Sequence, residues 1–73
     1  MSDWITVPVG QVAPGERVRV YGGAVELEVT RIDAPFLGRE EMVLLVESTD
    51  ERWACAPVPT SMEVEVLRQR SAL

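Results

Sequence analysis

Apolar and polar residues alternate on both sides of Gly22-Gly23, through the segments 17–21 and 24–28. With a two-residue loop at the glycines, apolar side chains face apolar ones and each arginine faces a glutamate. The pairs expected are Tyr21–Ala24, Val20–Val25, Arg19–Glu26, Val18–Leu27 and Arg17–Glu28. Glycine tolerates the positive φ of tight hairpin turns, and such cross-strand pairs stabilise a sheet. The pattern therefore predicts a β-hairpin, and we expect it to organise the chain.

The same alternation predicts a first strand over residues 4–9, with Ile5, Val7 and Val9 facing one side. Pro8 lacks an N–H, so this strand is expected either to lie at a sheet edge or to start irregularly. After the hairpin, the alternation breaks at Thr30-Arg31. A bulge or sharp bend there would restore it and would let a small sheet curl on itself.

Residues 42–47 form the most apolar stretch, and its continuous run predicts a central strand covered on both faces. A polar turn follows, and residues 52–56 are expected to return antiparallel. In that register Glu47 faces Arg52 and Val46 faces Trp53, so Trp53 is predicted to pack in the core. Cys55, between two alanines, is interpreted as a small core residue.

Three further segments complete the chain. Residues 33–41 are predicted to form the longest loop, in which Phe36 and Leu37 either fold under the barrel mouth as a plug or form a ligand-facing lip. Residues 57–60, with two prolines, are expected to lie outside any sheet, either extended or as one short helical turn. Residues 62–67 alternate as a last strand with Glu63 and Glu65 outward, although residues 61–70 also contain good helix formers. Residues 68–73 are expected to fray.

This order of elements predicts an all-β fold, a small antiparallel barrel of five or six strands in a single domain over residues 1–67. It resembles the Src-homology-3-like barrel in the segment 13–18, the hairpin, the long loop, the central strand pair and the proline-broken approach to the last strand. The resemblance covers residues 10–67 and is one of plan, since the 13–18 pattern recurs in hedgehog/intein-like and other small β domains. It transfers no functional residue, because fold does not specify function.

Charge and composition narrow the function. The chain has 73 residues, a net charge of −5 and arginine as its only basic residue type, a bias common in high-GC bacteria. Acidity disfavours nucleic acid, and the arginines Arg17 and Arg19 are expected to pair with glutamates, leaving Arg68 and Arg70. The acidic second half serves either solubility or docking of a basic partner. With one cysteine, no signal peptide and no membrane span, we expect a cytoplasmic protein.

Candidate chemistry is sparse. Histidine is absent, so no Ser-His or Cys-His pair exists, and the carboxylates lie in turns or outward on strands. We expect no catalysis, no metal and no cofactor. The favoured interpretation is a non-catalytic module that binds another protein, including a basic one, or a second copy of itself. The alternative is a small-molecule binder or accessory subunit that uses the barrel mouth near Phe36 and Trp53. The candidate binding residues are Trp4, Phe36, Leu37, Trp53, Glu63 and Glu65.

Overall fold

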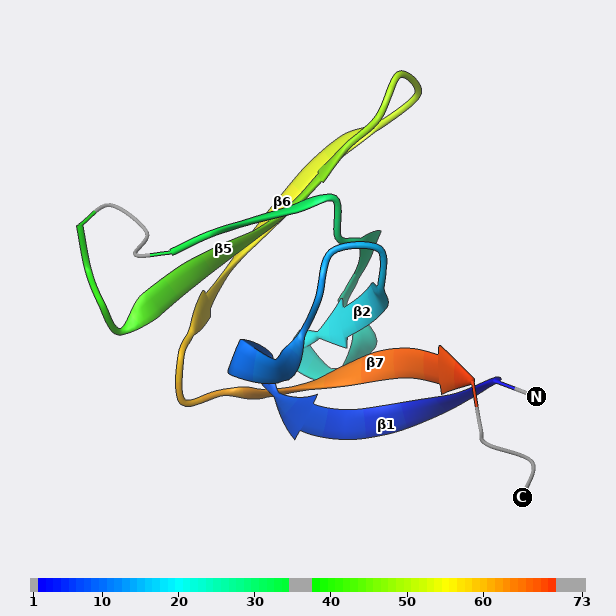
Figure 1. Ribbon diagram of the computed structural model, residues 1–73, viewed down its shortest axis with the longest axis horizontal. Coiled ribbons are helices and arrows are strands. Elements are labelled where there is room, and N and C mark those ends of the chain that lie inside the picture. Colours follow the sequence, from blue (N-terminus) through cyan, green and yellow to red (C-terminus); the bar gives the residue numbers. More distant parts are fainter. Residues whose placement is uncertain (1, 35–37, 70–73) are drawn as a thin grey trace.

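The computed structural model describes residues 2–34 and 38–69, which hold seven strands and two short 3-10 turns (Figure 1). The all-β prediction is confirmed. In chain order the elements are β1 (Ser2–Pro8), η1 (Val9–Gln11), β2 (Arg17–Val20), η2 (Tyr21–Gly23), β3 (Val25–Glu28), β4 (Arg31–Asp33), β5 (Met42–Ser48), β6 (Trp53–Pro59) and β7 (Glu63–Gln69). The predicted Phe36 and Leu37 lie outside the described residues.

The described strands form two antiparallel sheets, one in the order β1-β7-β2-β3 and one in the order β4-β5-β6. The chain bends at Thr30, as the broken alternation predicts, and there passes from the first sheet to the second. The Thr30 N–H donates to the Val46 carbonyl over 2.7 Å, which anchors the bend to β5. The two sheets stay open and no closed barrel forms among these strands, so four strands lie at sheet edges.

The predicted register of the first hairpin is confirmed from the Val20–Val25 pair to the Arg17–Glu28 pair. The two-residue loop is wrong, because residues 21–24 all lie in the turn. Tyr21, Gly22 and Gly23 have positive φ values of 54°, 68° and 90°, and this left-handed run widens the loop. Tyr21 is held there by its hydroxyl, which donates to the Pro57 carbonyl of β6.

The second hairpin forms, but its predicted register is wrong. Glu47 lies opposite Ala54, and Trp53 lies opposite Ser48 rather than Val46. The reason is the turn, where the Thr49 hydroxyl accepts hydrogen bonds from the N–H groups of Glu51 (3.3 Å) and Arg52 (3.0 Å). Trp53 is consequently moved to the hairpin end and is 67% exposed, so its predicted place in the core is also wrong.

The core is built between the two sheets, mainly from valines. Its fully buried side chains are Val18, Val20, Leu27, Val29, Leu45, Val58 and Val66. β5 is the central strand of its sheet, as predicted, and Val46 is buried on its other face. Cys55 pairs with Val46 on that other face and is half-buried, outside the main core where it was predicted.

Two segments near the end of the chain differ from expectation. Pro57 and Pro59 belong to β6, although they were predicted to lie outside any sheet. They fit because β6 is an edge strand, and the Thr60 N–H continues its ladder by donating to the Glu41 carbonyl over 2.7 Å. The alternating ladder then turns both proline nitrogens away from β5. The last segment is a strand rather than a helix, and it extends to Gln69.

Candidate interaction surface

The outer face of the four-stranded sheet collects polar and aromatic side chains from four strands. Residues such as Val7, Val18 and Val66 point to the core, so their neighbours along each strand point outward. The register aligns these outward residues in two rows, Thr6–Glu65–Arg19–Glu26 and Trp4–Leu67–Arg17–Glu28. This face therefore combines β1 and β7, far apart in the sequence, with the organising hairpin.

Trp4 and Arg19 are the central contact of this face. The Arg19 guanidinium carbon lies 3.8 Å from the centre of the Trp4 ring, in cation–π geometry. Glu26 accepts from Arg19 over 3.3 Å and from Arg17 over 2.6 Å, and these hydrogen bonds lower the pKa of the Glu26 carboxyl. Arg17 thus pairs diagonally with Glu26, although it was predicted to pair with Glu28. Trp4 lies half-buried beside this ion-pair group.

The predicted site residues fall in different places. Trp4, Glu63 and Glu65 come together on the outer face of this sheet, since Glu63 and Glu65 lie opposite Pro8 and Thr6 of β1. Trp53 lies on the other sheet, opposite Ser48 at the end of a hairpin. Its side chain is exposed, and the described part of the chain forms no barrel mouth around it.

β1 also presents a free edge. The Val9 N–H donates to the Met62 carbonyl over 3.0 Å, at a position that continues the β1–β7 register. Hydrogen-bonded pairs alternate in an antiparallel ladder, so Val7 and Ile5 turn their backbone groups to β7. The N–H and C=O groups of Trp4 and Thr6 therefore point away from the sheet. An open hollow lined by residues 3–6 follows this edge.

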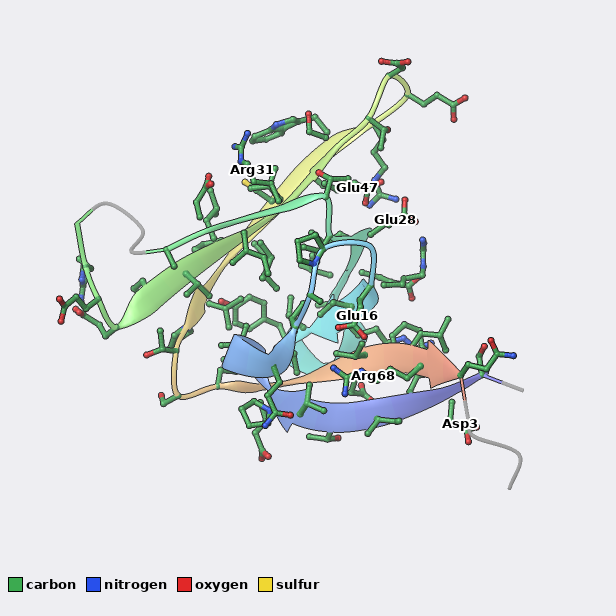
Figure 2. The ribbon with its side chains drawn as sticks, viewed as in Figure 1. Asp3, Glu16, Glu28, Arg31, Glu47 and Arg68 are labelled. Carbon is green, nitrogen blue, oxygen red and sulfur yellow. The ribbon has the colours of Figure 1, made fainter. Side chains whose placement is uncertain are left out.

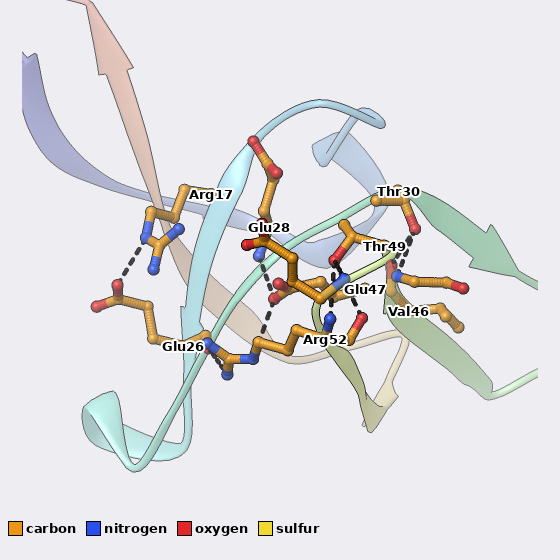
Figure 3. Close-up of polar contacts among 10 residues, drawn as sticks. Arg17, Glu26, Glu28, Thr30, Val46, Glu47, Thr49 and Arg52 are labelled. Atoms are coloured by element: carbon orange, nitrogen blue, oxygen red, sulfur yellow. Dashed lines mark hydrogen bonds and ion pairs between the residues drawn. The ribbon is translucent and has the colours of Figure 1, made fainter.

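The edge of β3 at the opposite end of the same sheet is covered. The Glu28 N–H donates to Glu47 Oε1 over 3.0 Å, and Arg52 Nη2 donates to the Glu26 carbonyl over 3.2 Å (Figure 3). Arg52 Nε also lies 3.7 Å from Glu47 Oε1. Glu47 is buried, with 7% of its surface exposed, and it connects the two sheets. Side chains of the second hairpin thus occupy the positions that an added strand would need.

The two edges of the three-stranded sheet are also protected. β4 has only three residues. β6 turns Pro57 and Pro59 outward, which removes two donors, and the Tyr21 hydroxyl occupies the Pro57 carbonyl. Short edges, prolines and side-chain cover are the usual ways in which proteins block strand addition. Within residues 2–34 and 38–69, β1 is the long edge with the least of this protection, because its one outward proline, Pro8, is its last residue.

Polar contacts elsewhere serve the fold. Arg68 on β7 points toward Glu16 in the loop before β2 (Figure 2), with Arg68 Nε 2.8 Å from Glu16 Oε2. This contact lowers the pKa of the Glu16 carboxyl. Arg68 Nη2 also donates to the Gln11 carbonyl over 3.0 Å. Of the arginines expected to remain for nucleic acid, Arg68 is therefore engaged within the domain. The described part of the chain brings together no group of three metal-ligating side chains.

Comparison with known proteins finds no matching family model, no similar curated protein and no similar solved structure. Helix in the described residues is confined to two three-residue turns, and neither is long enough to cross a membrane. The sequence patterns had placed Trp4, Glu63 and Glu65 among the candidate binding residues, but they did not single out Thr6 or Ile5 of β1, nor the cover that Glu47 and Arg52 give to β3. The feature of the sequence that came nearest to indicating the free edge of β1 was Pro8, which favours an edge position for its strand.

Proposed function

We propose that the protein is a non-catalytic interaction module that binds an extended segment of another polypeptide chain along β1. The observation that carries this proposal is the contrast among the sheet edges, of which β1 alone in the described chain is long and uncovered. An added strand satisfies the backbone groups of Trp4 and Thr6 and extends the sheet. Main-chain hydrogen bonds supply the affinity in this type of recognition, and side chains beside the edge supply the specificity.

The side chains next to this edge favour a particular kind of segment. Trp4 is held by Arg19 and offers an aromatic surface beside the added strand. Tryptophan is among the residues most enriched at binding hot spots. Glu63 and Glu65 lie one strand further in, so basic side chains on the added segment would complement this end of the outer face.

The strand plan supports a related proposal on the fold. We interpret the two open sheets as a variant of the Src-homology-3-like plan. The support is the organising hairpin and the bend at Thr30, which passes the chain from one sheet to the other.

Co-purification tests the proposed function. A tagged chain is expressed beside an untagged copy, and the polypeptides that it recovers are compared with those recovered by Thr6→Pro and Thr6→Val. Proline removes the outward N–H of Thr6, whereas valine keeps the N–H and the branched side chain. We expect Thr6→Pro to lose a chain that wild type and Thr6→Val both recover. Equal recovery by all three folded proteins would refute a binding role for the β1 edge.

Side-chain specificity has its own matched pair of variants. Trp4→Ala removes the aromatic surface beside the edge, and Trp53→Ala removes an exposed tryptophan from the other sheet. We expect recovery to fall for Trp4→Ala and to stay unchanged for Trp53→Ala. The reverse result would place the binding surface on the second sheet.

A further inference from the structure

We infer that the segment bound along β1 is β1 of a second copy of this chain, paired antiparallel about a two-fold axis at Ile5. This inference rests on the proposed function and names its partner. The pairing joins two four-stranded sheets into one continuous sheet. Figure 1 shows β1 at the border of the molecule, with no described strand beyond it. A two-fold interface of this kind uses the same surface on both copies.

The backbone groups of β1 suit this register. The outward-facing residues are Ser2, Trp4, Thr6 and Pro8, as the β1–β7 ladder requires. About a two-fold axis at Ile5, Trp4 lies opposite Thr6 of the second copy, and the two residues exchange both hydrogen bonds. Pro8 then lies opposite Ser2 of the second copy at each end of the new ladder. The missing N–H of Pro8 therefore falls at the ends and leaves the centre intact.

Ile5 selects this register among the possible ones. It points to the core side of the sheet with Val7, yet it is 40% exposed, since none of the described strands lies beyond β1. The two-fold axis brings it opposite Ile5 of the second copy as a non-hydrogen-bonded pair, with Cα atoms about 4.5 Å apart. An axis at Trp4 would instead set Ile5 against Asp3. An axis at Thr6 would bring Pro8 against Trp4 and lose hydrogen bonds nearer the centre.

The charges on the outer face are compatible with this pairing. Each row that ends in Trp4 continues into the row of the second copy that begins with Thr6. Leu67 and Trp4 of one copy are thus followed by Thr6 and Glu65 of the other. Glu65 never lies opposite Glu65, and Asp3 lies opposite Val7 of the second copy. Like charges do not face each other across the new pair of strands, although each chain carries a net charge of −5.

Solution mass gives the first test. We expect the wild-type chain and Thr6→Val to show twice the 8.1 kDa mass of one chain in sedimentation at high concentration. Thr6→Pro should show the mass of one chain. Pro8 already occupies an outward position of the same strand, and proline at residue 6 likewise removes an N–H that points away from β7, so the β1–β7 ladder keeps its hydrogen bonds; circular dichroism checks that the variant is folded. A wild-type chain that stays single at millimolar concentration would overturn the inference, as would a dimeric Thr6→Pro.

Cross-linking gives a second test that reads the register and does not depend on proline. In a Cys55→Ser background, we compare Ile5→Cys with Trp4→Cys and Thr6→Cys under mild oxidation. Only Ile5→Cys faces itself across the axis at a Cα separation within the range of a disulfide. We expect it to form a covalent dimer at least tenfold faster than the other two. Preferential cross-linking through Trp4→Cys or Thr6→Cys would overturn this register.

The two experiments separate this inference from the function on which it rests. A single wild-type chain that still recovers another protein, in a manner abolished by Thr6→Pro, would refute the self-pairing and leave the proposed function standing. A single chain with no Thr6-dependent partner would refute both. A dimer that cross-links through Ile5→Cys would support both.

Discussion

The two edges of the four-stranded sheet are treated in opposite ways. At β3, a buried carboxylate and an arginine from the second hairpin bind the Glu28 N–H and the Glu26 carbonyl. At β1, the corresponding groups of Trp4 and Thr6 face outward, and nothing in the described chain covers them. An uncovered edge invites strand addition, and proteins normally block it. This fold can therefore cover an edge with side chains, and it leaves β1 open.

The cover of the β3 edge requires the burial of a charged group, whereas β1 has no such cover in the described chain. Glu47 is 7% exposed and comes from the other sheet, and Arg52 reaches across from the turn that follows it. A buried carboxylate destabilises a fold unless hydrogen bonds compensate its lost hydration. Here the Glu28 N–H and Arg52 provide that compensation. Glu47 and Arg52, which we call the clasp, thus connect the two sheets and cover the edge of β3.

Amide hydrogen exchange gives the largest expected difference between the two edges. The Glu28 N–H is bonded to Glu47, so its exchange requires an opening of the structure. The Trp4 and Thr6 N–H groups need no such opening in a single chain. Measured at a dilution where the chain is single, Glu28 should exchange about a hundredfold more slowly than Thr6, or slower still. Equal rates would remove the distinction between the edges.

Mutation of the clasp is expected to have the largest effect on stability. Glu47→Ala leaves the Glu28 N–H without its acceptor and should lower the free energy of unfolding by about 1–3 kcal/mol. Glu47→Gln keeps an acceptor oxygen and should cost less. Chemical denaturation measures both, with Glu63→Ala as an exposed control on β7. If Glu47→Ala behaved like Glu63→Ala, the clasp would not stabilise the fold.

The clasp also shows what could be predicted from the sequence. The first hairpin was predictable because apolar and charge patterns select the same register, which the Val18–Leu27 and Arg19–Glu26 pairs confirm. The second hairpin was predictable as an element but not in its register, because the Thr49 hydroxyl in the turn sets that register and apolar residues fit several alignments. This shift moves Trp53 from the core to the surface.

The candidate surface was predictable only in part. Trp4, Glu63 and Glu65 were identified from residue type and alternation. Their assembly on one face depends on the pairing of β1 with β7, which joins segments about sixty residues apart and follows no local rule. The cover of the β3 edge was harder still to predict, because the contact between Glu47 and Glu28 depends on how the two sheets pack against each other.

The Arg68–Glu16 contact of β7, the strand next to β1, should have an effect of intermediate size on stability, and this effect should depend on pH. Arg68 of β7 lowers the pKa of the Glu16 carboxyl below its usual value of 4.5, so the folded state binds the Glu16 proton less tightly than the unfolded state does. Its stabilisation is present above about pH 4.5 and is lost as the pH falls through the folded pKa. Glu16→Gln should lower stability at pH 7 by about 1 kcal/mol and flatten the decline below pH 4.5. Urea denaturation between pH 3 and 7 checks this, with Glu63→Gln as the control; an unchanged slope for Glu16→Gln would contradict it.

The smallest expected stability effect concerns Trp4 itself. Stacking of Arg19 on Trp4 contributes about 0.5–1 kcal/mol at a site of this exposure, so Trp4→Ala should destabilise the single chain by about that amount. Trp53→Ala, from an exposed position on the other sheet, should change stability by less than about 0.5 kcal/mol. Because Trp4 borders the open edge, its variant should weaken strand binding far more than it weakens folding. Denaturation and sedimentation of the same two variants measure both effects, and a Trp4→Ala chain that unfolds readily yet pairs normally would assign Trp4 to the fold instead of the interface.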